Sequence, residues 1–391
     1  MPSDSTARPV RGRATGPRPA HRPGGSAAHV VVLGGGYAGL TAALGLAPHH
    51  RVTLVDPADG FTERIRLHQR AATGVEVTRP FSRLLGRSGV AHLPSRATDV
   101  DPVGRLVHTD DGRVLRYDRL VYALGSRTAT GGGVLGTGDR AYTTETAAEL
   151  HKHLLDDPGA AVTVVGGGFT GIETVTELAE AHPGREVRLV TSGELGPGLS
   201  HKGRDHVRRV LRGLGVAVTE GRRVGTADEL DTEMVVWTAA LTARAELARR
   251  AGIEVDPTGR IPVEPTLRSR SHPEIYAIGD AAALTTAEAG PLRMACATAT
   301  PMGAQAARAV TADLRGREPR PLRFSYFGAC VSLGRRDGLV QFLHPDDRPR
   351  ERVITGRGAA RFKEEVVRTT VRTLRLASRH PGVLRVLPGV G

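Results

Sequence analysis

The sequence predicts an α/β protein with two parallel-sheet units of similar design and a small C-terminal α+β region. Two observations lead to this prediction. A glycine-rich turn, with an apolar run before it and a helical pattern after it, occurs at residues 34–39 and again at 166–171. Short β-branched runs also alternate with helical segments, which is typical of βαβ units. A chain of 391 residues with 39% apolar content is long enough for two or three domains.

The first unit is expected to begin at Val30. Residues 30–33 form a continuous apolar run, as in a strand that a parallel sheet buries on both faces. A helix with an apolar face follows the glycines and ends at Pro48, and residues 51–56 return as a second buried strand. Residues 96–124 alternate apolar and polar side chains around two turn signals, so we expect a β-meander there.

The second unit repeats this order further along the chain. The predicted elements are a strand at 162–165, a helix at 172–181, and strands at 187–191, 216–221 and 234–239. The repetition indicates an internal duplication of one architecture, which makes the second unit an inserted or tandem domain.

The first glycine turn has the residues that a dinucleotide site needs. Gly34 permits the tight turn, Gly36 lets backbone amides approach a diphosphate, and Gly39 lets helix and strand pack closely. The helix N-terminus then offers the anion unpaired N–H groups and the positive end of its dipole. Asp56 lies twenty residues after Gly36, where its carboxylate can accept hydrogen bonds from ribose hydroxyls.

The second glycine turn repeats this pattern but lacks the acid. Its three glycines are Gly166, Gly168 and Gly171. Thr191 occupies the position that matches Asp56. Without a carboxylate there, Ser192 or a nearby arginine could accept a ribose 2′-phosphate, or Glu194 could replace the missing acid. The sequence leaves open whether the second dinucleotide carries a 2′-phosphate.

Two further segments complete a recognisable order. Residues 122–126 read Tyr-Ala-Leu-Gly-Ser and close the first unit, and residues 275–280 read as a strand ending at Gly279-Asp280, where a small-residue helix is expected to begin. Together with the two glycine turns, these segments resemble the FAD-dependent pyridine nucleotide oxidoreductases over about residues 29–320. The resemblance implies that the first unit binds FAD and the second binds NAD(P)H.

The resemblance also implies site residues and a domain division. The residues expected at FAD are Gly34, Gly36, Gly39, Asp56, Gly125 and Asp280. Those expected at NAD(P)H are Gly166, Gly168, Gly171 and Glu173. The FAD-binding domain then comprises residues 29–140 and 260–322, the NAD(P)H-binding domain 141–259, and a C-terminal region 323–391.

Within this family the chain is similar to type II NADH dehydrogenases. Cys296 and Cys330 lie 34 residues apart, so they cannot form the redox-active cysteine loop of the disulfide reductases, and they offer no metal-ligand spacing. Glu173 matches a glutamate that type II enzymes place near the nicotinamide, which makes it the candidate for orienting that ring. The alternative is a glutamate in the first helical turn that only complements the helix dipole.

Two segments of the resemblance concern the flavin and the electron acceptor. Residues 61–74 look like the segment that leads toward the flavin ring in type II enzymes. Residues 293–310 occupy the place where those enzymes present paired glutamines to a quinone, but here the pair falls on Pro301 and Met302. The resemblance implies a quinone as one acceptor, but the missing glutamine pair at Pro301 and Met302 counts against its use.

The net charge of +13 lies mainly at the two ends of the chain. Residues 1–28, which we interpret as a disordered tail, hold five Arg and one Asp, and residues 351–391 hold eight Arg, one Lys and three Glu. The body of the chain is nearly balanced, so nucleic acid is not an expected partner. No run has the length of a membrane span or the apolar core of a secretory signal, which predicts a cytoplasmic protein.

Residues 362–380 predict a basic amphipathic helix, because apolar side chains recur at helical spacing among lysine and arginine. Such a helix can lie on the inner face of an anionic cell membrane. It can equally pack on its own domain or on a second copy of the chain in a homodimer. The sequence leaves these uses open.

Three functions remain consistent with the sequence. The first is hydride transfer from NAD(P)H to FAD, followed by reduction of a quinone-like acceptor. The second keeps the flavin chemistry but reduces a soluble ferredoxin-type partner or a small metabolite. The third is a redox-responsive flavin-binding protein in which turnover is incidental.

Overall fold

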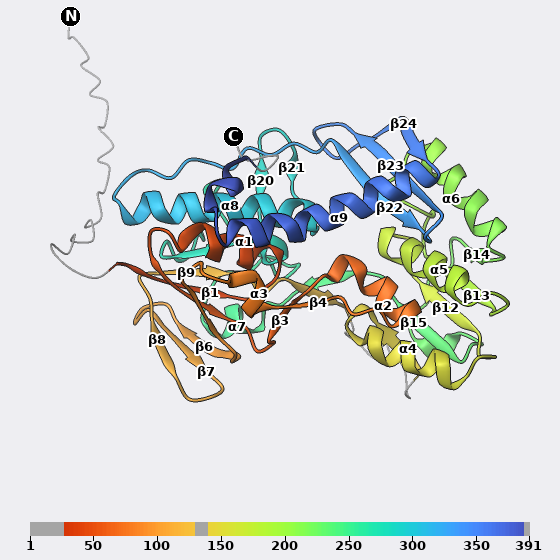
Figure 1. Cartoon of the computed structure of the whole chain (residues 1–391), viewed down its shortest axis with the longest axis horizontal. Helices are drawn as coiled ribbons and strands as arrows, with labels where there is room; N and C mark the ends of the chain where they lie inside the picture. Colours follow the sequence, from red (N-terminus) through yellow and green to blue (C-terminus); the bar gives the residue numbers. More distant parts are fainter. Residues whose placement is uncertain (1–26, 130–139, 387–391) are drawn as a thin grey trace, which may run out of the picture.

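The computed structural model describes residues 27–129 and 140–386. The predicted disordered tail therefore lies almost entirely outside the described residues. Two five-stranded parallel sheets lie along the long axis of the molecule, and a smaller antiparallel sheet with a long helix lies above them (Figure 1). The predicted fold class is confirmed: the protein is α/β, with two Rossmann-like units and a C-terminal α+β region.

The first sheet has the order β18-β9-β1-β2-β5, and all of its strand pairs are parallel. Its strands are β1 (His29–Leu33), β2 (Arg51–Val55), β5 (Val90–Leu93), β9 (Arg119–Tyr122) and β18 (Ile275–Ala277). Every residue of β1 is buried, as expected of a central parallel strand. Because β18 follows the whole second sheet in the sequence, the first unit is completed by a distant segment.

The second sheet has the order β11-β15-β12-β13-β14, again all parallel. Its strands are β11 (Ala141–Thr143), β12 (Val162–Val165), β13 (Val187–Val190), β14 (Ala217–Thr219) and β15 (Met234–Trp237). The strand before each glycine turn thus has equivalent neighbours, with the next strand on one side and a later strand on the other. This shared order is what an internal duplication produces.

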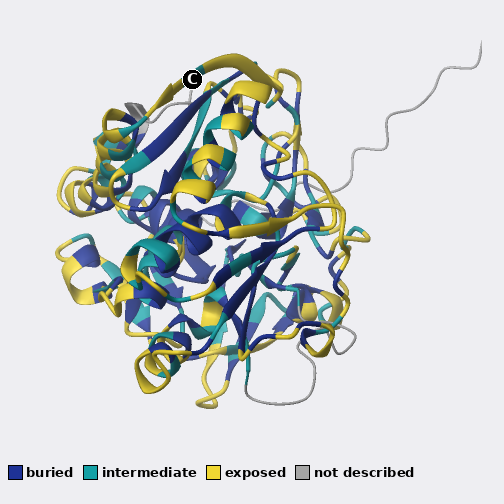
Figure 2. Ribbon diagram, turned by 90° about the vertical axis from the view of Figure 1, so that its right-hand side faces the viewer, coloured by how far each residue is buried: buried dark blue, intermediate teal, exposed yellow. Residues whose placement is uncertain are grey.

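Helices cover the sheets. α1 (Tyr37–Leu46) packs on the first sheet and against α8 (Cys296–Leu314). Small residues bring these two helices together, since a Cβ at Gly303 would lie 2.4 Å from the Ala38 carbonyl oxygen. The helices that surround the second unit are α2 (Leu67–Thr73), α4 (Ala147–Asp156), α5 (Phe169–Ala181) and α6 (His201–Gly213). Buried residues concentrate in the sheets and on the inner helix faces (Figure 2).

Residues 96–124 differ from the predicted meander at their last strand. β6 (Ala97–Asp101), β7 (Leu106–Thr109) and β8 (Val114–Arg116) form an antiparallel sheet that covers the first unit together with α7 (Glu246–Arg250). The following strand, β9, leaves this sheet and joins β1 in parallel. The difference has a physical reason, because three of the four residues of β9 are buried, which suits a central strand better than a surface meander.

The C-terminal region combines β22 (Gly328–Leu333), β23 (Asp337–Leu343) and β24 (Pro349–Thr355) with α9 (Arg357–Ala377). The apolar face expected for this helix is divided. Val371, Leu374 and Ala377 join the core of the first unit, whereas Phe362 and Val366 are 51% and 44% exposed. Ala359 and Val367 in the first half of α9 are also buried, and the helix contacts β22 and β23. One face of α9 therefore packs on its own chain along the whole helix, while Phe362, Val366 and Leu376 stay exposed.

The remaining short elements connect these parts. They are β3 (Gly60–Thr62), β4 (Thr78–Pro80), α3 (Phe81–Leu85), β10 (Ser126–Thr128), β16 (Leu241–Ala243), β17 (Ile261–Pro262), β19 (Ala282–Ala283), β20 (Thr285–Thr286) and β21 (Gly290–Pro291). The antiparallel pair of β10 and β16 joins the end of the first unit to the segment after the second sheet. Within the described residues, no helix has the length and apolarity that crossing a bilayer requires.

Candidate functional site

The first glycine turn has backbone geometry that only glycine accepts at two of its positions. Gly34 has φ +98°, and a Cβ there would lie 2.5 Å from the Ala123 carbonyl oxygen. A Cβ at Gly39 would lie 1.9 Å from the Gly34 oxygen. Gly36 caps α1 without a side-chain hydrogen bond, and a Cβ there would meet nothing within 4 Å. The first amides of α1 therefore face open space, which is the geometry of an anion site.

Asp56 lies beside this turn, directly after β2. Its Oδ2 accepts a hydrogen bond from the Gly35 amide at 2.6 Å, and its Oδ1 accepts one from the Ala58 amide at 2.9 Å. Two backbone donors thus fix the carboxylate next to the glycine turn. The structure places Asp56 with Gly34, Gly36 and Gly39, as the sequence predicts.

Gly125 and Asp280 come together because β9 and β18 are neighbouring strands. Gly125 follows β9 with φ +69°, and a Cβ there would meet nothing within 4 Å. The Asp280 Oδ2 accepts a hydrogen bond from the Ser126 hydroxyl at 2.6 Å. The helix expected to begin at Asp280 is wrong: residues 279–281 form one 3-10 turn and then enter β19. The pairing of β19 with β17 gives this backbone a strand partner in place of a helix.

The second glycine turn repeats the geometry of the first. Gly166 has φ +123°, a Cβ at Gly171 would lie 1.8 Å from the Gly166 oxygen, and a Cβ at Gly168 would meet nothing within 4 Å. α5 begins at Phe169, within the turn, rather than at residue 172 as predicted. Its first amides are therefore available to an anion in the same way as those of α1.

The acid is missing at the second glycine turn, as the sequence indicates. Thr191 follows β13 and is buried, and its Oγ1 would lie 2.7 Å from a Cβ at Gly167. Glu194, the alternative acid, pairs instead with the Arg204 Nε at 3.2 Å and with Arg208 at 3.7 Å. Both arginines belong to α6, so this carboxylate is turned toward that helix.

Glu173 is buried in the second turn of α5 and pairs with a lysine from α9. Its Oε1 accepts hydrogen bonds from the Lys363 Nζ at 2.7 Å and from the Ser332 amide at 3.0 Å. The partner residues belong to α9 and β22, so the pair ties the second unit to the C-terminal region. Because Glu173 is the fifth residue of α5, it does not act as a first-turn carboxylate.

Glu173 and Lys363 are both ionised at neutral pH. Burial alone would raise the pKa of Glu173, but Lys363 and the Ser332 amide outweigh burial and hold the pKa below its usual value. Burial likewise opposes the charge of Lys363, and Glu173 raises its pKa above the usual value. Burial lowers the pKa of His68 to about 4, so its ring is neutral and Lys363 is the compensating cation.

Replacing Lys363 by methionine should leave Glu173 buried without a counter-charge. We expect the free energy of unfolding at pH 7 to fall by about 3–5 kcal/mol. Restoring neutrality in the double variant Lys363→Met, Glu173→Gln should recover part of this loss. The stabilisation by Glu173 should be complete above its unfolded-state pKa of 4.5 and should disappear as the pH falls through the lower folded-state pKa.

Urea unfolding of the FAD-saturated proteins measures these differences. Lys152→Met is the matched control, because Lys152 is an exposed lysine on α4 and its loss should change the unfolding free energy by less than about 0.5 kcal/mol. If Lys363→Met is as stable as this control, the pair does not carry the compensating charge.

Lys363 is a candidate residue that sequence reasoning missed. Its Nζ also donates to the Cys330 carbonyl oxygen at 3.1 Å, and its charge acts on the thiols of Cys330 and Cys296. Both cysteines are free: Cys296 is exposed, whereas Cys330 is half-buried, and burial raises the pKa of the Cys330 thiol. The composition could have drawn attention to Lys363, because it is one of only three lysines among 54 basic residues. A compact ammonium fits a buried pair where a forked guanidinium needs more partners.

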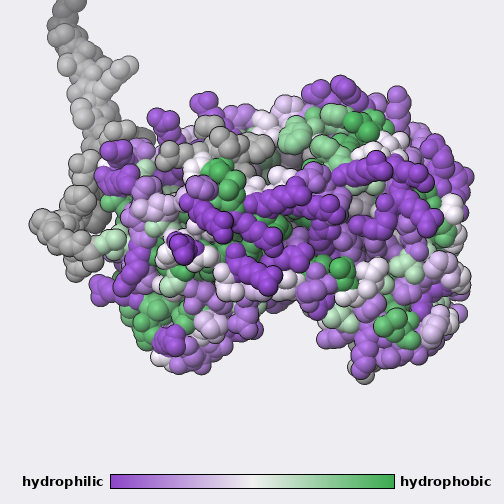
Figure 3. Space-filling view, in the orientation of Figure 1, coloured by the Kyte–Doolittle hydropathy of each residue, from purple (hydrophilic) through white to green (hydrophobic). Residues whose placement is uncertain are grey.

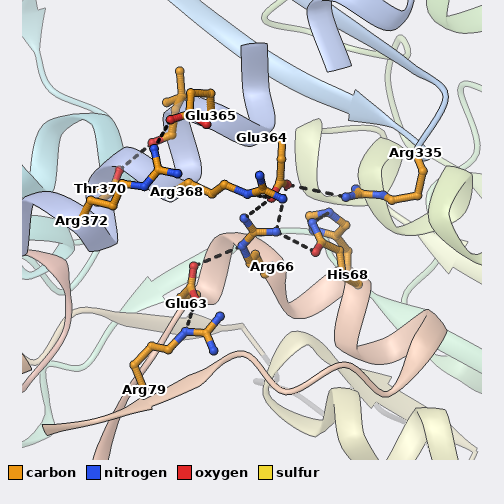
Figure 4. Close-up of polar contacts among 12 residues, drawn as sticks. Glu63, Arg66, His68, Arg79, Arg335, Glu364, Glu365, Arg368, Thr370 and Arg372 are labelled. Atoms are coloured by element: carbon orange, nitrogen blue, oxygen red, sulfur yellow. Dashed lines mark hydrogen bonds and ion pairs between the residues drawn. The ribbon is translucent and has the colours of Figure 1, made fainter. Parts of the chain in front are cut away.

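A second ion-pair network fixes α9 at the next residue. Glu364 accepts from the Arg66 Nη2 at 2.7 Å, and Arg66 also pairs with Glu63 at 3.1 Å (Figure 4). Arg335 reaches Glu364 from the opposite side at 3.8 Å (Figure 4). The segment 61–74, expected near the flavin, is therefore held against α9 by charged hydrogen bonds in a largely buried setting.

The residues at the expected glutamine positions do not line an open site. Pro301 and Met302 are both buried within α8. The Met302 sulfur accepts a hydrogen bond from the Gly279 amide at 3.2 Å, which fixes the turn that carries Asp280. Pro301 and Met302 thus support the first unit, and neither side chain is exposed to an acceptor.

Comparison with known proteins agrees with this geometry. A family model described as pyridine nucleotide-disulphide oxidoreductase matches residues 28–310. The chain belongs to this family. A NADH dehydrogenase-like protein of Mycobacterium tuberculosis is 30% identical over 346 residues, 78% of this chain and 85% of that protein. The type II NADH:quinone oxidoreductase of Staphylococcus saprophyticus is 28% identical over 389 residues, 87% and 94% of the two chains.

Solved structures share the fold. The sulfide:quinone oxidoreductase of Aquifex aeolicus has a TM-score of 0.75 at 20% identity and covers 93% of this chain and 96% of its own. NDH2 of Plasmodium falciparum, solved with NADH, has a TM-score of 0.73 at 15% identity. The match covers 91% of this chain and 98% of that one. This member of the family is an FAD-dependent oxidoreductase with NAD(P)H as its co-substrate.

The residues at the first glycine turn fit FAD. Gly36 and Gly125 leave open space where a Cβ would project. Asp56 is held nearby by the Gly35 amide, and Asp280 by the Ser126 hydroxyl. A diphosphate needs the open amides of α1, and ribose and ribityl hydroxyls need carboxylate acceptors.

Proposed function

We propose that this enzyme oxidises NAD(P)H and passes the electrons, through FAD held at Gly34, Gly36, Gly39, Asp56, Gly125 and Asp280, to a quinone-like acceptor. Bound FAD supplies the chemistry, because it accepts a hydride and releases the electrons to a second substrate. The protein positions the reactants, because the second glycine turn holds the nicotinamide nucleotide through Gly166, Gly168 and Gly171. Relatives named type II NADH:quinone oxidoreductases support the choice of acceptor.

The observation that carries this proposal is the double role of α9. On its inner side, Lys363 reaches the buried Glu173 of α5. On its outer side, the neighbouring Phe362 and Val366 are exposed to solvent. One helix therefore links the place where Glu173 would orient the nicotinamide with an apolar surface that a hydrophobic acceptor can approach.

The same helix favours a peripheral contact with an anionic membrane. Arginines lie exposed along it, at Arg357, Arg361, Arg368, Arg372 and Arg375, and hydrophilic side chains follow its outer face in Figure 3. Two of them are partly neutralised, because Arg368 pairs with Glu364 and Arg372 with Glu365. Each basic group near an anionic surface contributes about 1 kcal/mol, and the exposed apolar pair adds burial energy. The proposed location is the inner face of the cell membrane.

Acceptor kinetics in vesicles test this function. The enzyme, reduced anaerobically with NAD(P)H, is mixed with anionic vesicles that contain a long-chain naphthoquinone, and reoxidation is followed by flavin absorption. We expect rapid reoxidation, and we expect the double variant Phe362→Ser, Val366→Ser to be at least about tenfold slower, since burying these chains is worth more than about 1.4 kcal/mol. Leu155→Ser is the matched control, since Leu155 is 61% exposed on α4.

Ferricyanide provides the reference reaction for both variants, because it is water-soluble. If reduced wild-type enzyme is reoxidised by a ferredoxin-type protein and not by the quinone, the soluble alternative is correct. If no acceptor reoxidises the flavin at a useful rate, the protein acts as a redox-responsive binder. An equal loss of rate in the Leu155→Ser control would show that the exposed apolar side chains of α9 have no special role in reaching the acceptor.

A further inference from the structure

The two glycine turns differ most clearly at the residue that meets the adenosine ribose. At the first turn, the carboxylate of Asp56 accepts the Gly35 amide at 2.6 Å. At the second turn, Thr191 holds the equivalent place against Gly167 and carries no charge. A carboxylate at this position binds a free 2′-hydroxyl and repels a 2′-phosphate. The second turn therefore lacks the group that would exclude a phosphorylated ribose.

The two carboxylates nearest to Thr191 in the sequence of this edge, Glu194 and Glu220, already pair with other residues. Glu194 pairs with Arg204 and Arg208 on α6. Glu220, which follows β14, accepts the Leu195 amide at 2.6 Å and pairs with Arg208 at 3.0 Å. Both carboxylates are thus engaged by arginines of α6 and by the loop backbone, so neither replaces the missing acid beside Gly167.

Basic residues lie along the same edge of the sheet. The Arg222 amide donates to the Thr191 carbonyl oxygen at 3.0 Å, and the Gly221 amide donates to the Gly193 oxygen at 3.5 Å, so residues 221–222 run beside residues 191–193. Arg222 and Arg223 are exposed there. Val224, the next residue, is buried in the cluster with Val190 and Trp237, which anchors the segment.

Arg222 keeps donors available for a ligand. Its Nη2 donates to the Glu229 carbonyl oxygen at 2.9 Å, which orients the guanidinium without neutralising it. A guanidinium has five N–H donors in a fixed fork, and this fork matches a phosphate. Ser192 directly follows Thr191 and offers a hydroxyl on the same edge.

We propose that this enzyme selects NADPH over NADH, and that Arg222, Arg223 and Ser192 form the subsite for the 2′-phosphate. The inference rests on the second glycine turn holding the nicotinamide nucleotide, as proposed above. Charge-assisted hydrogen bonds to a phosphate, together with the absence of a repelling carboxylate, give a preference of roughly 10- to 100-fold.

Two measurements on the FAD-containing enzyme test the subsite. The first is anaerobic flavin reduction at low concentrations of NADPH and of NADH, which gives the ratio of the second-order rate constants. We expect a ratio above about ten for the wild type. The double variant Arg222→Ala, Arg223→Ala should bring this ratio to about one, and the Arg222→Lys, Arg223→Lys variant should retain most of it because the charge remains.

The second measurement is calorimetric binding of 2′,5′-ADP and of 5′-AMP, which needs no flavin reduction. We expect 2′,5′-ADP to bind more tightly, and we expect Thr191→Glu to reverse that order by returning a carboxylate to the turn. Arg209→Ala, which removes an exposed arginine of α6, is the matched control and should change neither ratio.

The outcomes separate this inference from the proposed function. Equal or weaker use of NADPH in the wild type, with equal binding of the two adenosine nucleotides, overturns the subsite while leaving the oxidoreductase function intact. Preferential binding of 2′,5′-ADP in a protein whose flavin neither nucleotide reduces supports the subsite and overturns the function. A rate ratio that the double alanine variant leaves unchanged removes Arg222 and Arg223 from the subsite.

Discussion

Replacing Gly36 by valine is expected to give a folded protein that purifies without FAD. Gly36 has φ −76° and ψ −170°, a conformation that valine adopts readily, and a Cβ there meets no protein atom within 4 Å. The substitution should therefore leave the chain itself unstrained. The added methyl groups would occupy the space in front of the α1 amides, where the diphosphate of FAD needs close backbone approach.

The measurement is the ratio of flavin absorption to protein absorption after purification, with circular dichroism to confirm folding. We expect the flavin content to fall by at least about tenfold, since losing even one charge-assisted contact to a phosphate costs roughly 1.5 kcal/mol or more. Gly213→Val is the matched control, because a Cβ at this α6 glycine also meets nothing within 4 Å. A Gly36→Val protein that retains its yellow colour would show that FAD does not lie against this turn.

Gly168→Val should affect the other cofactor. Unlike Gly36→Val, this variant should retain FAD, but the nicotinamide nucleotide should no longer reduce its flavin. Gly168 has φ −73°, and a Cβ there again meets nothing within 4 Å. The valine would block the α5 amides while leaving the first glycine turn untouched. We expect the second-order rate constant of flavin reduction to fall by about 100-fold or more, through weaker nucleotide binding and misplacement of the nicotinamide.

Anaerobic rapid mixing with NADPH and NADH measures this rate, and dithionite provides the control, since it reduces flavin without the nucleotide site. Gly171→Val would be a poor substitute for this test. A Cβ at Gly171 would lie 1.8 Å from a backbone oxygen, so that variant should misfold. Loss of both cofactors in Gly168→Val would contradict the assignment of one dinucleotide to each turn.

The sequence predicted those parts of the site that depend on local geometry. Gly34, Gly39, Gly166 and Gly171 are required by a tight strand-to-helix turn, which is encoded within a few residues. The absence of an acid at Thr191 could also be predicted, because in a βαβ unit the acidic residue lies at a fixed spacing from the glycine turn. In these cases the structure places the residues where the pattern indicates.

The parts that could not be predicted depend on contacts between distant segments. Lys363 meets Glu173 across 190 residues of sequence, and no local pattern encodes that meeting. The helix expected at Asp280 is instead a single turn, because β19 finds a partner in β17. Some apolar side chains of α9 lie in the core, such as Val371, and others lie in solvent, such as Val366, and which of them are buried depends on the distant elements that pack against each face of the helix.

The binding of one dinucleotide at each glycine turn is tested most directly by an anaerobic titration of the purified wild-type enzyme with NADPH and NADH, followed through the visible absorption of the flavin. We expect stoichiometric nucleotide to bleach the flavin band, with NADPH effective at lower concentration. A flavin band that neither nucleotide bleaches, in a protein that dithionite reduces fully, would contradict the claim that the second glycine turn presents a hydride donor to FAD.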